Sequence, residues 1–130
     1  MASGKPPAES LPLVLCVDDE PPILAALSRL LRHEPVQVVT TDDPEVALER
    51  IRTGTVRLIL CDYRMRVMSG TSLLQVVKAL SPSTVRILLT GYPEDARIRA
   101  AAEKGLMRLC TKPWDDEELR RIVREGICPS

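Results

Sequence analysis

The stretch LVLCVDDE at residues 13–20 joins a short apolar run to consecutive acidic residues, and RLILCDYRM at residues 57–65 repeats this pattern. Short runs rich in valine, leucine and isoleucine are typical of buried parallel strands. In such sheets, ligands bind beyond the carboxyl ends of the strands. We therefore expect Asp18, Asp19 and Asp62 to share an acidic site at one edge of a parallel sheet.

Converging carboxylates repel one another unless a cation joins them. A hard divalent ion relieves this repulsion because it can bind carboxylate, carbonyl, water and phosphoryl oxygens together. We expect this ion to be Mg²⁺, bound by Asp18, Asp19 and Asp62. The alternatives are that Asp18 and Asp19 cap the next helix, and that Asp62 caps the loop after it.

A hydroxyl and an ammonium group follow two further apolar runs. Thr90 ends RILLT, and Lys112 follows RLCT, so both are expected at strand ends. Phosphoryl transfer leaves negative charge on the equatorial oxygens, and a metal ion, a hydroxyl donor and a positioned cation stabilise that charge. The set favours phosphoryl chemistry. The alternatives are an ordinary strand end at Thr90 and a solvated lysine at Lys112.

Four motifs in this order resemble the receiver domain of two-component response regulators: VDDE at 17–20, DYRMRVMSG at 62–70, LTGY at 89–92 and TKPW at 111–114. The resemblance covers about residues 13 to 127. The order of the motifs is more specific than any one of them.

The resemblance implies a role for each site residue. Asp62 would accept a phosphoryl group from a histidine kinase. Mg²⁺ would be held by Asp18, Asp19, Asp62 and the backbone carbonyl of Arg64. Thr90 and Lys112 would bind the phosphoryl oxygens, with a cis peptide bond before Pro113 directing the lysine inward.

Strands and helices are expected to alternate, which predicts a parallel sheet covered on both faces. Apolar spacing predicts helices at 22–32 and 119–127, Asp43-Pro44 marks another helix start, and the acidic run 115–118 favours the positive end of the last helix. The expected strands are 13–17, 37–41, 58–61, 86–90 and 109–111. The resemblance implies the flavodoxin-like doubly wound α/β fold with strand order 2-1-3-4-5.

Length and composition fit one domain, because the chain has 130 residues of which 45% are hydrophobic. We expect a receiver domain at 13–127 between a flexible N-terminal tail at 1–12 and a C-terminal tail at 128–130. Basic and acidic residues number 18 each, so no nucleic-acid footprint is indicated. No apolar stretch approaches the roughly 18 residues of a membrane helix, and no signal-peptide core precedes the domain, which favours the cytoplasm.

The four cysteines form no C-x-x-C pair, and His33 is the only histidine in the sequence. Metal–thiolate and redox chemistry are therefore not expected. Cys16, Cys61 and Cys110 lie in strand patterns, where a reduced cysteine behaves as a small hydrophobe.

Two residues depart from the usual pattern of the family. Arg66 replaces the proline usual four residues after the phospho-acceptor, and Leu109 replaces the aromatic residue usual three residues before the lysine. Leucine has no polar tip, so we expect activation to use the loop at 91–95 instead of an aromatic switch. Arg64 and Tyr92 would flank the path by which water attacks the acyl phosphate, so we expect slow self-dephosphorylation. The alternative is that these two residues face partners.

Three function classes are open: a phosphorylatable phosphorelay switch, a phosphatase-like enzyme and a non-phosphorylated interaction module. The switch is favoured because Arg64 stands where a haloacid-type phosphatase would have a second acid, while a degenerate module would have lost Asp62 or Lys112. We expect no enzymatic activity beyond its own phosphorylation and dephosphorylation.

The expected partners are a sensor histidine kinase or phosphotransfer protein, an output domain or downstream protein, and a second copy bound through the 92–127 face. No direct contact with nucleic acid or membrane is expected. LTGY combined with TKPWDDEEL is similar to receivers attached to cyclic-di-nucleotide phosphodiesterase domains or to ATP-dependent transcriptional activators. The chain is expected to be either a stand-alone receiver or a fragment.

Overall fold

The computed structural model describes residues 11–128. The tails expected at 1–12 and 128–130 lie almost entirely outside these residues, so the domain limits stay a prediction. Strands and helices alternate in the order β1 (Leu13–Val17), α1 (Pro21–Leu31), β2 (Gln37–Thr41), α2 (Pro44–Arg52), β3 (Val56–Asp62), α3 (Gly70–Leu80), β4 (Val85–Thr90), α4 (Ala96–Glu103), β5 (Arg108–Thr111) and α5 (Asp116–Ile127).

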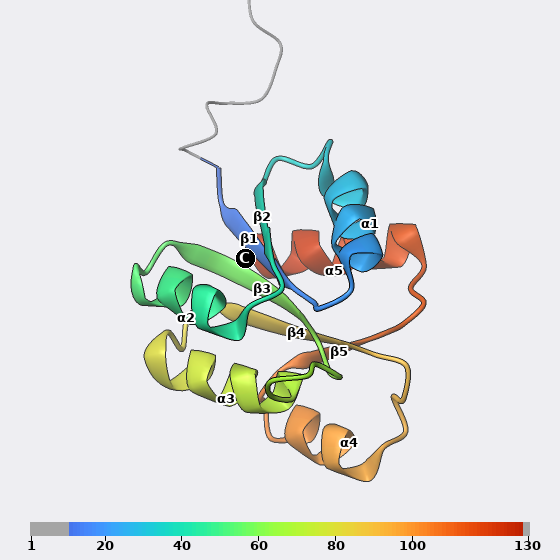
Figure 1. Cartoon of the computed structure of the whole chain (residues 1–130). Helices are drawn as coiled ribbons and strands as arrows, with labels where there is room; N and C mark the ends of the chain where they lie inside the picture. The colour runs from blue at the N-terminus through green and yellow to red at the C-terminus, as the bar shows by residue number, and fades with distance from the viewer. Residues whose placement is uncertain (1–10, 129–130) are drawn as a thin grey trace, which may run out of the picture.

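All neighbouring strands pair in parallel, and the sheet has the order β2-β1-β3-β4-β5. Helices α1 and α5 cover one face of the sheet, and α2, α3 and α4 cover the other (Figure 1). This arrangement confirms the predicted flavodoxin-like fold and strand order. It also places β1 beside β3, which are the strands that end at the acidic residues.

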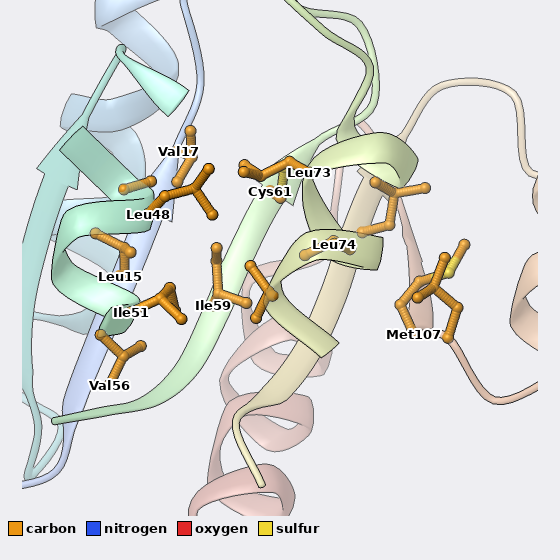
Figure 2. Close-up of a cluster of buried hydrophobic side chains, with 14 of the residues drawn as sticks. Leu15, Val17, Leu48, Ile51, Val56, Ile59, Cys61, Leu73, Leu74 and Met107 are labelled. Carbon is orange, nitrogen blue, oxygen red and sulfur yellow. The ribbon is translucent and has the colours of Figure 1, made fainter. Parts of the chain in front are cut away.

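Each face of the sheet has its own hydrophobic core, because successive side chains of a strand point to opposite faces. All five residues of β1 are buried. Leu13, Leu15 and Val17 pack towards α2 and α3, whereas Val14 and Cys16 pack towards α1 and α5. Figure 2 shows the first core, in which sheet residues meet Leu48, Ile51, Leu73 and Leu74 of the helices.

The first two strands have the predicted bounds. Where other elements differ from the prediction, the difference lies at their ends. β3 begins at Val56, two residues before the prediction, and includes Asp62. α5 begins at Asp116, before its first apolar residue, because the Asp115 side chain accepts a hydrogen bond from the Glu118 N–H at 2.9 Å. Asp43 caps α2 in the same way through the Glu45 N–H, as the Asp-Pro pair predicted. The acidic run at 115–118 therefore begins a helix.

The four cysteines are free thiols; Cys16, Cys61 and Cys110 are buried and Cys128 is exposed. Burial raises the pKa of the Cys16 thiol to about 12 and that of the Cys110 thiol to about 11. These thiols therefore stay protonated near neutral pH. Among residues 11–128, no helix is both long and apolar enough to cross a bilayer.

Candidate functional site

Strand register brings the predicted site residues to one edge of the sheet. Val17 pairs with Cys61, so Asp18 and Asp62 follow at the same level on adjacent strands. Thr90 pairs with Thr111, so Lys112 leaves β5 beside the end of β4. Residues far apart in sequence thus meet because their strands are neighbours that run in the same direction.

Lys112 joins two of the acids. Its ammonium donates hydrogen bonds to Asp62 Oδ1 at 2.8 Å and to Asp18 Oδ2 at 3.1 Å. Both acids are buried, with the Asp18 side chain 1% exposed and the Asp62 side chain 6% exposed. The Lys112–Pro113 peptide bond is cis, as the resemblance predicted.

Burial raises the pKa of Asp62, and the charges of Asp18 and Asp19 act in the same direction against the hydrogen bond from Lys112. Burial also lowers the pKa of Lys112, but its hydrogen bonds to Asp62 and Asp18 outweigh this effect and leave the pKa raised. Two carboxylates, Asp18 and Asp62, thus share one ammonium. An additional cation would reduce the remaining repulsion between them.

The acids at the end of β1 do not serve as side-chain caps of α1. The N-cap of α1 is Glu20, whose side chain makes no capping hydrogen bond, and Pro21 begins the helix. Proline lacks an N–H group, so the first turn has fewer donors to satisfy. Asp18 Oδ1 instead accepts the Glu20 N–H at 2.9 Å, which holds the turn after β1 in place.

The carboxylate oxygens suit a hard divalent ion. Asp18, Asp19 and Glu20 each offer an oxygen within 4.8 Å of the others, so this donor set fits Mg²⁺. Glu20 was not among the predicted ligands, although its place directly after the acidic pair was a usable signal. Asp62 does not belong to this group and is joined to Asp18 through Lys112.

A hollow of about 150 Å³ is lined by all three residues predicted to take or bind the phosphoryl group, Asp62, Thr90 and Lys112. Thr90 is 1% exposed, and its hydroxyl oxygen accepts the Tyr92 N–H at 3.0 Å. Asp18 and Asp19 do not line this hollow. Its lining residues are Glu20, Asp62, Tyr63, Arg64, Thr90, Gly91, Tyr92 and Lys112.

Arg64 and Tyr92 lie against each other at the rim of this hollow. The guanidinium carbon of Arg64 is 4.7 Å from the centre of the Tyr92 ring, which is a cation–π contact. The sequence placed both residues near the site, but it did not predict that they touch. The pair links the loop after β3 to the loop after β4.

Gly70 supports the site in a way that was missed at the sequence level. A Cβ atom at this position would overlap the carbonyl oxygen of Asp62 and lie 2.7 Å from Leu88 Cδ1. The Gly70 N–H donates to the Tyr63 carbonyl at 2.8 Å and closes the loop after Asp62. The glycine at the end of DYRMRVMSG was the available signal.

The doubly wound sheet, with acids and a lysine at its carboxyl edge, defines a class of α/β regulatory domains. The model of the response regulator receiver domain matches residues 14–124. The chain belongs to this family.

A curated relative, the hydrogenase transcriptional regulatory protein HoxA of Bradyrhizobium diazoefficiens, is 37% identical over 115 residues, which are 88% of this chain and 24% of HoxA. The chain thus spans about a quarter of the length of the curated relatives it matches. These relatives are named as transcriptional regulatory proteins.

Solved structures with a similar fold include receiver domains. The signal receiver domain of an HD domain-containing protein from Pseudomonas fluorescens has a TM-score of 0.82 and 35% identity, covering 90% of this chain and 87% of that one. The beryllofluoride-activated NtrC4 receiver domain dimer has a TM-score of 0.80 and 26% identity, covering 88% and 95%.

Proposed function

We propose that the chain is a phosphorelay switch in which Asp62 accepts a phosphoryl group from a histidine kinase or phosphotransfer protein. The observation that carries this proposal is the position of Asp62, 2.8 Å from the Lys112 ammonium and in one hollow with Thr90. An anionic nucleophile, a cation and a hydroxyl group are the parts that phosphoryl transfer needs. Membership of the receiver family supports the same assignment.

In the proposed reaction, an Asp62 carboxylate oxygen forms a bond to phosphorus while the bond from phosphorus to the donor nitrogen breaks. The Lys112 ammonium, already at the carboxylate, would stabilise charge on the phosphoryl oxygens, and the Thr90 hydroxyl would donate to one of them. Asp18, Asp19, Asp62 and the Arg64 carbonyl would hold Mg²⁺. The ion would neutralise phosphoryl charge and reduce repulsion among the acids.

We infer that the receiver comprises residues 13–127 and acts in the cytoplasm, where reduced buried thiols are expected. Its output would be a further domain or a separate downstream protein, as the names of the transcriptional regulators among its relatives suggest. A second copy would bind through the 92–127 face. The similar NtrC4 receiver domain, which is named as a dimer, supports the pairing of two copies.

The test is to incubate the protein with acetyl phosphate and Mg²⁺ and to measure its intact mass. We expect one alkali-labile and hydroxylamine-labile phosphoryl group in the wild type and none in Asp62→Asn, because the amide cannot act as the anionic nucleophile. Asp42→Asn, at an exposed acid, is the matched control and should be phosphorylated normally.

Two other results would contradict the proposal. Consumption of acetyl phosphate without an adduct would favour a phosphatase-like enzyme. No reaction with either acetyl phosphate or a phosphorylated histidine donor would favour an interaction module.

A further inference from the structure

Arg66 contacts an acid that we assign to the metal site. Its backbone N–H donates to Asp19 Oδ2 at 3.0 Å, and its guanidinium Nε lies 3.5 Å from the same oxygen. Proline, which is usual in the family at this position, has neither an N–H group nor a charge and could make neither contact. The departure noted in the sequence therefore adds a counterion to the site.

The acids have two counterions that differ in exposure. Lys112 is the counterion of Asp18 and Asp62, and its side chain is 18% exposed. The Arg66 side chain is 84% exposed, whereas the Asp19 side chain it contacts is 15% exposed. Water and ions can therefore replace the arginine easily, while the lysine is enclosed by the site.

The same contact holds the β3–α3 loop, residues 63–69, against the end of β1. Asp19 and Arg66 line one groove together with loop residues Tyr63, Arg64, Met65, Met68 and Ser69. A metal ion that takes the Asp19 oxygen would remove the acceptor of both Arg66 donors. The proposed bond from the Arg64 carbonyl to the ion would then hold the loop in place of the Arg66–Asp19 contact.

We propose that Arg66 is a displaceable counterion of Asp19 that competes with Mg²⁺ for the Asp19 carboxylate and so weakens Mg²⁺ binding. The proposal rests on the proposed function only in taking the acid cluster as the Mg²⁺ site. Arg66 acts through Asp19, so it is a residue that sets metal affinity and takes no part in the chemistry.

Metal affinity can be measured without phosphorylation, by calorimetric titration of the full chain with Mg²⁺. Exposed ion pairs contribute modestly, so Arg66→Ala should bind Mg²⁺ about two- to fivefold more tightly than the wild type. Arg57→Ala, at an exposed arginine of β3, controls for the loss of one positive charge and should leave the affinity unchanged. Because salt screens exposed charges, the gain in Arg66→Ala should shrink at high KCl.

A double-mutant cycle with Asp19→Asn separates a local contact from a general charge effect. If Arg66 acts through Asp19, then Arg66→Ala should have no further effect on Mg²⁺ affinity in the Asp19→Asn background. Thermal unfolding without Mg²⁺ checks that each variant is folded.

The failures are distinguishable. Equal affinity in the wild type and Arg66→Ala, or an equal gain in Arg57→Ala, would overturn the role of Arg66 and leave the proposed function intact. No Mg²⁺ binding, or binding that Asp19→Asn does not weaken, would overturn the metal site itself and the role of Arg66 with it.

Discussion

Gly70→Ala is expected to destabilise the protein because the new methyl group would press on the backbone of Asp62. The overlapping atom is the Asp62 carbonyl oxygen in β3, and a central strand cannot yield as the end of a side chain can. Glycines with positive φ among residues 11–128 are Gly54 and Gly105, so Gly70 needs no unusual backbone conformation. In the folded protein, the effect of this substitution is therefore steric.

The expected loss follows from two opposing contributions. Overpacking a well-packed region destabilises by about 1–3 kcal/mol. Replacing glycine by alanine also restricts the unfolded chain, which returns about 0.4–1 kcal/mol. We expect a net loss of about 1–2 kcal/mol in the free energy of unfolding, since the neighbouring atom is backbone. We also expect slower phosphorylation, because a shift of about 1 Å at a reacting group can lower the rate by roughly a hundredfold.

Urea unfolding followed by circular dichroism measures the free energy of unfolding from the midpoint and slope. Gly91→Ala is the matched control, because its Cβ would lie 3.5 Å from the Lys112 carbonyl oxygen, an ordinary contact. This control should stay within about 0.5 kcal/mol of the wild type. An unchanged midpoint in Gly70→Ala, or an equal loss in both variants, would refute the steric argument.

Four further predictions concern phosphoryl lifetime, thiol labelling, pH dependence and the switch. The double variant Arg64→Asn, Tyr92→Glu should lose its phosphoryl group faster than the wild type at saturating Mg²⁺, because small or flexible polar groups readmit water; an equal or longer half-life would show that the pair faces a partner. At pH 8 a thiol reagent should label Cys128 quickly and the other cysteines only after unfolding; fast labelling of Cys16 would contradict its burial. Because burial raises the pKa of Cys16 from 9.0 to about 12, its contribution to stability is present below pH 9 and lost as the pH rises towards 12. Amide exchange across 91–108 should change with beryllofluoride, and identical rates would argue against a switch there.

The fold and the meeting of the acids with Lys112 could be predicted because few rules decide them. Apolar runs locate parallel strands, and functional groups at their carboxyl ends share one edge of the sheet. The register Val17–Cys61 then sets Asp18 beside Asp62 without any detail of the loops. The strand order itself came from the family resemblance, since periodicity does not specify which strands are neighbours.

Contacts between loop side chains could not be predicted in this way. Arg66 and Asp19 are 47 positions apart, and their contact depends on the path of the β3–α3 loop. The Arg64–Tyr92 stack likewise depends on side-chain conformations that no hydrophobic period determines. The need for glycine at position 70 could not be predicted for the same reason. It depends on the Asp62 carbonyl oxygen, which the first residue of α3 approaches.

Helix α4 is the element whose movement the proposed switch would need, and it is the helix least held by the core. Its buried residue is Ile98, whereas α3 and α5 each bury four residues. Full burial of one isoleucine is worth about 1.5–3 kcal/mol. Two positions of α4 can therefore differ in free energy by a similarly small amount. A phosphoryl group that binds more tightly in one of these two states could reverse which state is more stable.

In the proposed switch, the path from the site to helix α4 would begin at Thr90. Its hydroxyl oxygen accepts the Tyr92 N–H, so drawing that hydroxyl towards a phosphoryl group at Asp62 would alter the hydrogen bond that begins the loop to α4. The Asp95 side chain at the other end of this loop caps α4 through the Arg97 and Ile98 N–H groups. Leu109 is half-buried and packs on the same core as Ile98, but it makes no polar link in this path. We infer that loop 91–95 can transmit the change without an aromatic residue at position 109.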